Sequence, residues 1–300
     1  MKAFYSDHFA LPLPEGHRFP MAKYPLLRQQ ALAEGILNAG QLVEPEAVTQ
    51  EELTLVHTRA YVSSVLGGTL SPKAMRRIGF PWSPALVERS RRSVGGTICA
   101  GRAALQDGVA VNLAGGTHHA FPDYGAGFCV FNDVAVAARA LQREGAVRRV
   151  VVLDCDVHQG DGTAAIFLGD PTVFTFSIHG ARNYPFHKQC SDLDIELEDG
   201  TEDADYLRAL QDGVERALER AHADLAFYLA GADPFIGDRL GRLALTKEGL
   251  ATRDWIVLEM CRQRDLPVAI VMAGGYARQI QDIVDIHLMT VRLATEFAGV

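Results

Sequence analysis

Three side chains of the kinds that bind divalent metals alternate along one short segment, Asp154-Cys155-Asp156-Val157-His158. The apolar residues Val150–Leu153 come directly before this segment and predict a buried strand. Because successive side chains of a strand point to opposite faces, Asp154, Asp156 and His158 are expected to lean to the same side where the strand ends. Carboxylates and an imidazole are costly to bury without a partner, and a divalent cation is the obvious partner for them.

Asp233 follows the apolar stretch Asp224–Leu229 and offers a further carboxylate. With Asp156 and His158 it completes a set of three protein ligands, which is typical of catalytic zinc sites because another position stays open for water. Zinc held in this way lowers the pKa of bound water to about 7 and polarises a carbonyl, and the same donors suit Fe²⁺ or Mn²⁺. Taken singly, each acid is equally compatible with a helix cap or a solvated turn.

A histidine pair and a tyrosine offer groups for proton transfer. His118 and His119 follow two glycines, and aspartates are available elsewhere in the chain to orient both rings. A histidine backed by a carboxylate has a fixed tautomer and greater basicity, so such a pair suits a general base and a general acid. Tyr276 follows Gly274-Gly275 and can donate a hydrogen bond to an oxyanion from a pliable loop. The alternatives are one exposed and one buried, hydrogen-bonded histidine, and a plain turn before the tyrosine.

The elements that must position these groups alternate along the chain. Short apolar runs predict strands at Ala110–Leu113, Val150–Leu153, Thr172–Ile178, Asp224–Leu229 and Pro267–Met272. Helices are expected from Asn132 or Asp133 to about Gly145, from Asp203 to His222, and from Thr246 to about Arg264. This alternation predicts an α/β fold with a mostly parallel sheet covered by helices on both faces. Each polar cluster follows a strand, so the clusters should meet at the carboxyl edge of the sheet, where ligands bind in such folds.

Charge and composition exclude several classes of protein. The chain has 300 residues and a net charge of −8, which argues against a nucleic-acid-binding protein with a basic face. Five scattered cysteines without a C-x-x-C pair predict a reduced, cytoplasmic protein. We recognise no signal peptide, and no apolar run approaches the ~18 residues that a membrane span needs. The sequence has neither a phosphate-binding G-K-[ST] loop nor a G-x-S-x-G motif.

One segment is strongly acidic. Residues Asp192–Asp205 include eight carboxylates and no lysine or arginine. We expect a solvated face around a turn at Gly200, and the alternative is a weak electrostatic attraction for cationic substrates.

Taken together, the motifs resemble those of the zinc-dependent histone deacetylases. The residues that carry the resemblance follow the order and spacing of that family: Gly115-Gly116-Thr117-His118-His119-Ala120, Gly127-Phe128-Cys129, Asn132-Asp133, Asp154-x-Asp156-x-His158-x-Gly160-Asp161-Gly162, Gly231-Ala232-Asp233 and Gly274-Gly275-Tyr276. Gly16–Met21 and Gly200–Asp203 are similar to the class IV and bacterial branch. The resemblance spans nearly the whole chain and implies an arginase/deacetylase-like fold, with residues 1–300 as a single catalytic domain.

The resemblance also implies a role for individual residues. It implies that the catalytic zinc, or Fe²⁺, is bound by Asp156, His158 and Asp233. It implies that His119, backed by Asp161, is the general base and acid. It implies that His118, backed by Asp154, is the electrostatic companion of His119. It implies that Tyr276 polarises the carbonyl. A potassium ion is implied beside the metal at Asp154, Asp156, His158, Ser177 and Ile178. The acyl-lysine channel is implied at Gly127 and Phe128, with Tyr184, Phe186 and Leu240 as further walls.

A few positions depart from the residues that many members of that family carry. They are Thr117, Gln159, Ala273 and the loop Arg182-Asn183-Tyr184. None of these departures removes a catalytic group. They are expected around the channel, so they bear on the length of the acyl chain.

These features predict a metal-dependent amidohydrolase that removes an acyl group from an amine, in the first instance the ε-amine of lysine in a protein or peptide. A deacylase of acetylpolyamines or other small acylated amines is a close alternative. An arginase-like hydrolase is a weaker one, because its two-manganese site needs D-x-H-x-D signatures and this chain has D-x-D-x-H. A catalytically inactive acyl-lysine-binding protein is a further alternative, although such a protein has no use for proton-transfer groups.

Overall fold

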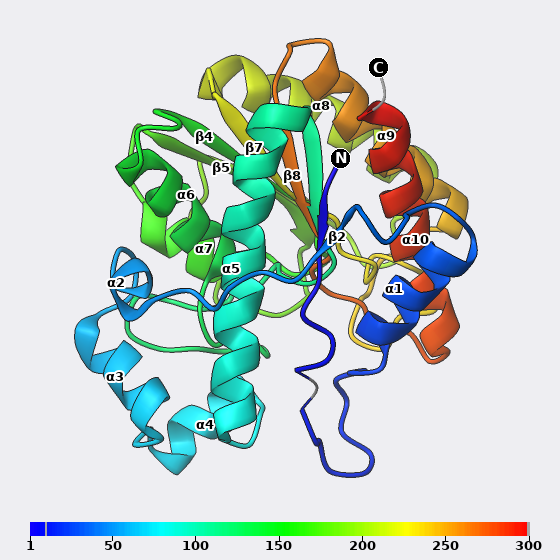
Figure 1. Ribbon diagram of the computed structural model, residues 1–300. Helices are drawn as coiled ribbons and strands as arrows, with labels where there is room; N and C mark the ends of the chain where they lie inside the picture. The colour runs from blue at the N-terminus through cyan, green and yellow to red at the C-terminus, as the bar shows by residue number, and fades with distance from the viewer. Residues whose placement is uncertain (10, 299–300) are drawn as a thin grey trace.

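A parallel sheet runs through the middle of the computed structural model, which describes residues 1–9 and 11–298 (Figure 1). Its strands are β1 (Ala3–Phe4), β2 (Leu42–Val43), β3 (Val109–Asn112), β4 (Val150–Asp154), β5 (Val173–Gly180), β6 (Leu193–Leu197), β7 (Leu225–Leu229) and β8 (Val268–Val271). Across the described residues the strand order is β2-β1-β3-β8-β7-β4-β5-β6, and every neighbouring pair is parallel. The predicted α/β class with a parallel sheet is confirmed.

Helices connect the strands and cover both faces of the sheet. They are α1 (Lys23–Ala33), α2 (Gln50–Leu53), α3 (Arg59–Gly67), α4 (Pro72–Ile78), α5 (Pro84–Asp107), α6 (Asp133–Arg143), α7 (Asp161–Phe167), α8 (Asp203–Ala221), α9 (Lys247–Arg262) and α10 (Ile280–Phe297). Figure 1 shows α5 and α6 on one side of the sheet and α9 and α10 on the other. None of the helices in the described part of the chain is long and apolar enough to cross a membrane.

Each face of the sheet belongs to its own hydrophobic core. On β4, Val151 and Leu153 pack into the core that includes α8, α9 and α10, whereas Val150 and Val152 pack into the core that includes α5 and α6. All four side chains are at most 1% exposed. A parallel strand buried on both faces needs an uninterrupted apolar run, which is why this strand is recognisable in the sequence.

Most of the predicted elements are confirmed. The five predicted strands are β3, β4, β5, β7 and β8, and each end lies within two residues of the predicted one. The three predicted helices are α6, α8 and α9. The side chain of Asn132 caps α6 by accepting a hydrogen bond from the N–H of Ala135. The side chain of Thr246 caps α9 by accepting a hydrogen bond from the N–H of Gly249.

The acidic segment is only partly as expected. The turn at Gly200 is present, with a φ of +80°. The carboxylates of the first half are largely solvated as expected, since Asp192, Glu196 and Glu198 are exposed. The segment is not only a turn, however, because Leu193–Leu197 form the edge strand β6. Asp192 accepts hydrogen bonds from both the N–H and the hydroxyl of Thr175, so its carboxylate ties this edge strand to β5.

The strands that precede the polar clusters end at the same level. The register places Asp154 opposite Ser177 on β5 and opposite Leu229 on β7. Leu229 lies opposite Val271 on β8, which lies opposite Asn112 on β3. The segments that follow these strands therefore start from one row of the sheet, and residues far apart in the sequence meet above it.

His57, between α2 and α3, joins the N-terminal helices to this edge of the sheet. Its ring is buried, with Nδ1 donating to the carbonyl of Phe121 at 2.9 Å and Nε2 accepting from the N–H of Asn132 at 3.0 Å. A carbonyl can only accept and an N–H can only donate, so these contacts require the neutral ring. Burial lowers the pKa of His57 to about 4, although hydrogen bonding to the backbone opposes the shift.

The pKa of His57 predicts a loss of stability in acid. Between about pH 6.5 and pH 4 the unfolded chain binds a proton at this residue and the folded protein does not, so acid favours unfolding in that window. We expect the wild-type free energy of unfolding to fall by about 3 kcal/mol more than that of His57→Gln across the window, with no difference in slope above it. Urea denaturation at several pH values measures this, and parallel profiles for the two proteins would contradict it.

Candidate active site

Asp156, His158 and Asp233 lie together at the carboxyl edge of the sheet, although Asp233 follows a different strand from the other two. All three are buried, and one ligand atom from each lies within 4.8 Å of the others. Nδ1 of His158 is 2.9 Å from Oδ1 of Asp156 and 3.2 Å from Oδ2 of Asp233. Backbone N–H groups orient the carboxylates, since Val157 donates to Oδ1 of Asp233 and Gly274 donates to Oδ2 of Asp156. The structure therefore brings the three predicted metal ligands into one cluster.

This cluster fits a divalent cation. Burial, followed by the charge of Asp156, raises the pKa of Asp233 to about 7. Burial lowers the pKa of His158, but hydrogen bonds to the two aspartates outweigh burial and raise the pKa to about 10. The aspartates thus favour a positive charge at His158, and burial together with Asp156 disfavours a second negative charge at Asp233. Oδ2 of Asp233 is buried, and apart from its contact with Nδ1 of His158 at 3.2 Å it has no partner among the described residues, so it is available to ligate a cation. Two carboxylates and an imidazole suit zinc or Fe²⁺.

Gly274 lets the loop after β8 approach these carboxylates. A Cβ atom at this position would collide with Oδ2 of Asp233 and press on Oδ2 of Asp156. The glycine is therefore required by the close approach of backbone to ligand oxygens.

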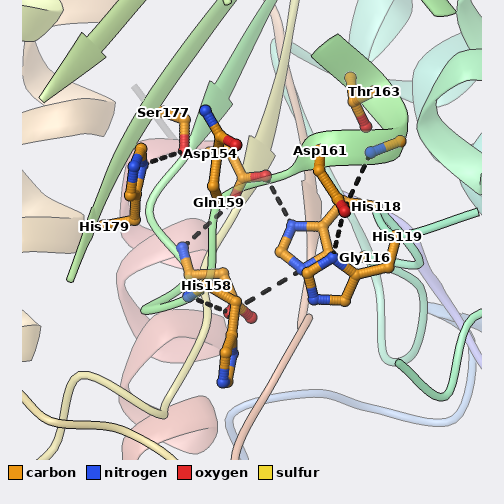
Figure 2. A network of polar contacts seen from close by, with 12 residues as sticks. Gly116, His118, His119, Asp154, His158, Gln159, Asp161, Thr163, Ser177 and His179 are labelled. Atoms are coloured by element: carbon orange, nitrogen blue, oxygen red, sulfur yellow. Dashed lines mark hydrogen bonds and ion pairs between the residues drawn. The ribbon is translucent and has the colours of Figure 1, made fainter. Parts of the chain in front are cut away.

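The two adjacent histidines are each held by a different aspartate. Nδ1 of His118 lies 2.7 Å from Oδ2 of Asp154, and Nδ1 of His119 lies 2.6 Å from Oδ1 of Asp161. Figure 2 shows the two rings side by side, each turned toward its carboxylate, and their centroids are 4.1 Å apart. Since Nδ1 is engaged in both rings, Nε2 is the atom of each that is left for other contacts.

The environments of the two imidazoles push their pKa values apart. Burial lowers the pKa of His118, but the charges of Asp154 and Asp156 outweigh burial and raise the pKa to about 9. Burial, followed by the charge of His118, lowers the pKa of His119 to about 4. One ring therefore favours the cation while its neighbour favours the neutral base, and this difference suits two distinct roles.

Tyr276 faces the same site from the loop after β8. Its N–H donates to Oδ2 of Asp238 at 2.6 Å, which fixes the backbone that carries the phenol. Burial raises the pKa of Tyr276 well above its ordinary value, and the charges of Asp233 and Asp156 raise it further. The side chain therefore stays a protonated phenol, which is able to donate a hydrogen bond.

A cavity of about 460 Å³ leads down to these groups. His119, His158 and Tyr276 lie among its lining residues. The five residues predicted as channel walls also line it: Gly127, Phe128, Tyr184, Phe186 and Leu240. The ring of Tyr184 meets that of His119 edge-on, with centroids 4.9 Å apart. The predicted wall residues and the proton-transfer groups therefore share one cavity.

Phe128 forms a strained part of this wall. Its φ is +66°, in the left-handed region, which costs about 1–3 kcal/mol for a residue other than glycine. Its N–H donates to the carbonyl of Ile78 at 2.7 Å, and the N–H of Gly127 donates to that of Arg77 at 3.2 Å. The end of α4 thus holds the wall in a conformation that the wall would not adopt alone.

The profile of the histone deacetylase domain matches residues 17–291 of the sequence. The chain belongs to the histone deacetylase family. A protein of Picosynechococcus named only as uncharacterized is 48% identical over 292 residues, which cover 97% of both chains. Histone deacetylase 2 of Arabidopsis thaliana is 29% identical, over 90% of this chain and 73% of its own length. The acetoin utilization protein AcuC of Staphylococcus aureus is 28% identical, over 86% of this chain and 72% of its own.

Solved structures of this family share the fold. A histone deacetylase homologue from Aquifex aeolicus superposes with a TM-score of 0.85 at 24% identity, covering 99% of this chain and 84% of its own. A histone deacetylase homologue complexed with SAHA gives 0.84 at 24% identity, covering 100% of this chain and 84% of its own. The deacetylase-like fold predicted from the motifs is confirmed.

One departure from the family's usual residues lies elsewhere than expected. Gln159 is buried and does not line the cavity within the described residues. Its amide nitrogen donates to the carbonyl of Gln189 at 2.7 Å and to Oδ1 of Asp194 at 2.9 Å. The side chain thus fastens the 183–190 loop to β6. Its polar ends are occupied by protein groups, so its effect on the channel is indirect.

The residues expected around potassium lie on neighbouring strand ends of this deacetylase. Asp154 is opposite Ser177 in the β4–β5 register, and Ile178 follows on β5. Oγ of Ser177 is 2.9 Å from Nδ1 of His179, and Figure 2 shows that pair next to Asp154. The potassium site itself stays a prediction.

Arg253 on α9 is a buried residue that we did not predict. Its Nη1 donates to the carbonyls of Gly231 at 2.6 Å and Cys155 at 3.3 Å, so one guanidinium joins the two segments that carry the predicted metal ligands. A signal for it is present in the sequence. Residues 250, 257, 258 and 261 form an apolar stripe at helical spacing, and the charged pair Arg253-Asp254 lies on that stripe.

Substitution of Gly274 by alanine is expected to abolish metal binding, because the added methyl group collides with ligand oxygens. Metal content after loading with zinc should fall from one ion per chain to a small fraction of that. Gly67→Ala is the control, since a Cβ there meets only a methyl group of Thr69 at 3.9 Å. Elemental analysis of folded protein, checked by circular dichroism, decides the matter. Full zinc occupancy in Gly274→Ala would contradict this account of the site.

Proposed function

We propose that this family member hydrolyses the amide between an acyl group and the ε-amine of lysine, using zinc or Fe²⁺ bound by Asp156, His158 and Asp233. One observation carries the proposal. Two imidazoles, each hydrogen-bonded to its own buried aspartate, and a phenol converge on the predicted metal-ligand cluster, where the active-site cavity adjoins a small inner pocket. A protein that only bound acyl-lysine would have no use for two carboxylate-oriented imidazoles.

Each group has a chemical role in this proposal. The chemistry that the divalent ion supplies when bound is polarisation of the acyl carbonyl and increased acidity of water. His119 takes a proton from the attacking water at Nε2 and later gives one to the leaving amine. His118 contributes positive charge, and Tyr276 donates to the carbonyl oxygen as negative charge develops there. The water oxygen bonds to the acyl carbon, the C–N bond breaks, and a free amine and a carboxylic acid result.

The shape of the cavity suits a lysine side chain. Phe128 and Tyr184 offer aromatic walls, Leu240 offers an aliphatic one, and Gly127 leaves room beside the ring of His119. Apolar walls favour the methylene stem of lysine, while the polar groups at the floor receive the amide. We further propose that potassium binds beside the metal at Asp154, Asp156, His158, Ser177 and Ile178, where it would stabilise the strand ends.

The experiment that tests the proposal is an activity panel. Peptides carrying lysine acylated with chains of increasing length are incubated with zinc-loaded and Fe²⁺-loaded protein, and the released amine is quantified. Acetylpolyamines form a parallel arm. We expect turnover of acyl-lysine by at least one metal form, with kcat/KM dependent on chain length. No amide hydrolysis with either metal would refute the proposal.

Substitution of His119 by alanine is expected to lower kcat by about 10²–10⁴, which is the usual contribution of a positioned acid or base. His8→Ala is the control, because that imidazole is 43% exposed and pairs with Glu44. Steady-state kinetics on protein of measured metal content provide the comparison. Near-wild-type turnover by His119→Ala would exclude the assigned role.

Substitution of Tyr276 by phenylalanine removes one hydroxyl and leaves the ring. We expect folded, metal-loaded protein with kcat lowered on the order of 10²-fold or more, because the donor to the developing oxyanion is lost. Tyr5→Phe serves as the matched control, since Tyr5 lies outside the cavity that holds His119. An unchanged kcat in Tyr276→Phe would remove the phenol from the mechanism.

A further inference from the structure

The entrance of the active-site cavity carries a concentration of positive charge. Five of the fifteen residues that line the cavity are arginines, and among the described residues no aspartate or glutamate lines it. We call this set the entrance arginines: Arg18, Arg77, Arg182, Arg239 and Arg242. The chain as a whole has 37 acidic and 29 basic residues, so the sign of charge at the entrance is opposite to that of the protein.

Four separate segments deliver these arginines. Arg18 comes from the N-terminal segment, Arg77 from α4, Arg182 from the loop after β5, and Arg239 and Arg242 from the loop that follows Asp233. All five are exposed at the surface. Like charges from different segments repel one another, and repulsion at an entrance has no benefit for folding. Their gathering there is therefore better explained by a ligand than by stability.

Protein carboxylates neutralise only part of this charge. Arg242 lies 3.0 Å from Asp199, and Arg182 lies 3.9 Å from Glu198 in a pair with 68% and 80% exposed side chains. An exposed pair of that kind contributes little. Both carboxylates belong to the acidic segment, so that part of the segment is engaged with arginines rather than available to cationic substrates.

The other three entrance arginines form no ion pair with the described residues. The guanidinium of Arg77 lies 4.5 Å from the centroid of the Tyr124 ring. Arg239 donates to the carbonyls of Tyr276 at 2.9 Å and Arg18 at 3.2 Å. Rings and carbonyls fix a guanidinium without cancelling its charge. Arg18, Arg239 and Leu240 also enclose a side cavity of about 230 Å³ beside the entrance, which is large enough for a carboxylate group.

We propose that the entrance selects acyl-lysine flanked by acidic residues and disfavours polyamines and basic peptides. The inference rests on the proposed function, because it concerns the substrate of the same site. Guanidinium groups bind carboxylates through paired, charge-assisted hydrogen bonds. Several arginines around a cleft also attract anions from solution and raise their association rate. An acetylpolyamine carries its charges on amines and meets repulsion at the same place.

The test uses acetyl-lysine peptides of one length that differ only in the flanking residues, which are glutamate, glutamine or lysine. Metal-loaded full-length protein is assayed for kcat/KM at low and at high salt, with an acetylpolyamine as a further substrate. Binding of the same peptides is measured by fluorescence anisotropy, which does not depend on turnover. We expect kcat/KM and affinity to be at least about tenfold higher for the acidic than for the basic peptide, with a difference that shrinks in salt.

A matched pair of double variants assigns the effect to the entrance. Arg18→Gln with Arg182→Gln should weaken the preference for the acidic over the glutamine peptide severalfold. Arg143→Gln with Arg148→Gln changes the net charge by the same amount. These two residues lie between the end of α6 and the start of β4, on the opposite edge of the sheet, so this variant should keep the wild-type preference. If all peptides are hydrolysed and bound alike, or the basic one is preferred, the inference is wrong and the deacylase proposal stands. If none is hydrolysed, the proposed function fails, and anisotropy still decides whether acidic peptides bind preferentially.

Discussion

The burial of Asp156 beside Asp233 is the constraint on which the rest of the active site depends. Both carboxylates are at most 1% exposed, and like charges in a dry interior repel strongly. The fold offsets this repulsion with groups from other segments. These are the N–H of Val157 for Asp233, the N–H of Gly274 for Asp156, and the imidazole of His158 between the two. A cation would complete that compensation, so the same arrangement that makes the site costly also suits it to bind a metal.

Charge is arranged differently at the floor and at the entrance of the cavity. The floor holds two buried carboxylates, which raise the pKa of His158 between them. The entrance holds arginines from four segments. A cation is favoured at the floor and an anion at the entrance, so the two ends of the cavity suit ligands of opposite charge. Phe128 and Tyr184 line the same cavity as the arginines and His119, and they give it aromatic walls.

Much of this was readable from the sequence, because the strands beneath the site are buried on both faces. The run Val150–Leu153 and its counterparts give long apolar signals, and polar residues directly after them mark the carboxyl edge of the sheet. The short strands β1 and β2 were missed, because two residues cannot show a periodicity. The strand β6 was missed for another reason, since its acidic residues resemble those of a solvated loop.

Other features depend on tertiary contacts that a linear sequence does not display. Nothing near Arg18 or Arg77 indicates that they meet Arg239 at one entrance. The direction of the Gln159 side chain was likewise set by Gln189 and Asp194, which follow it by some thirty residues. Arg253 is an intermediate case, because its place on an apolar helical stripe is visible while its two carbonyl partners are not.

The residues around the predicted metal site are far apart in the sequence, and this separation has a consequence for biosynthesis. Val157 and Asp233 are 76 residues apart, and Asp156 and Gly274 are 118 apart, yet each pair is joined by a direct hydrogen bond. A nascent chain that ends before Asp233 contains Asp156 and His158 without their distant partners. The three predicted ligands can therefore act together only after Asp233 has been synthesised, and the N–H that orients Asp156 becomes available later still, with Gly274.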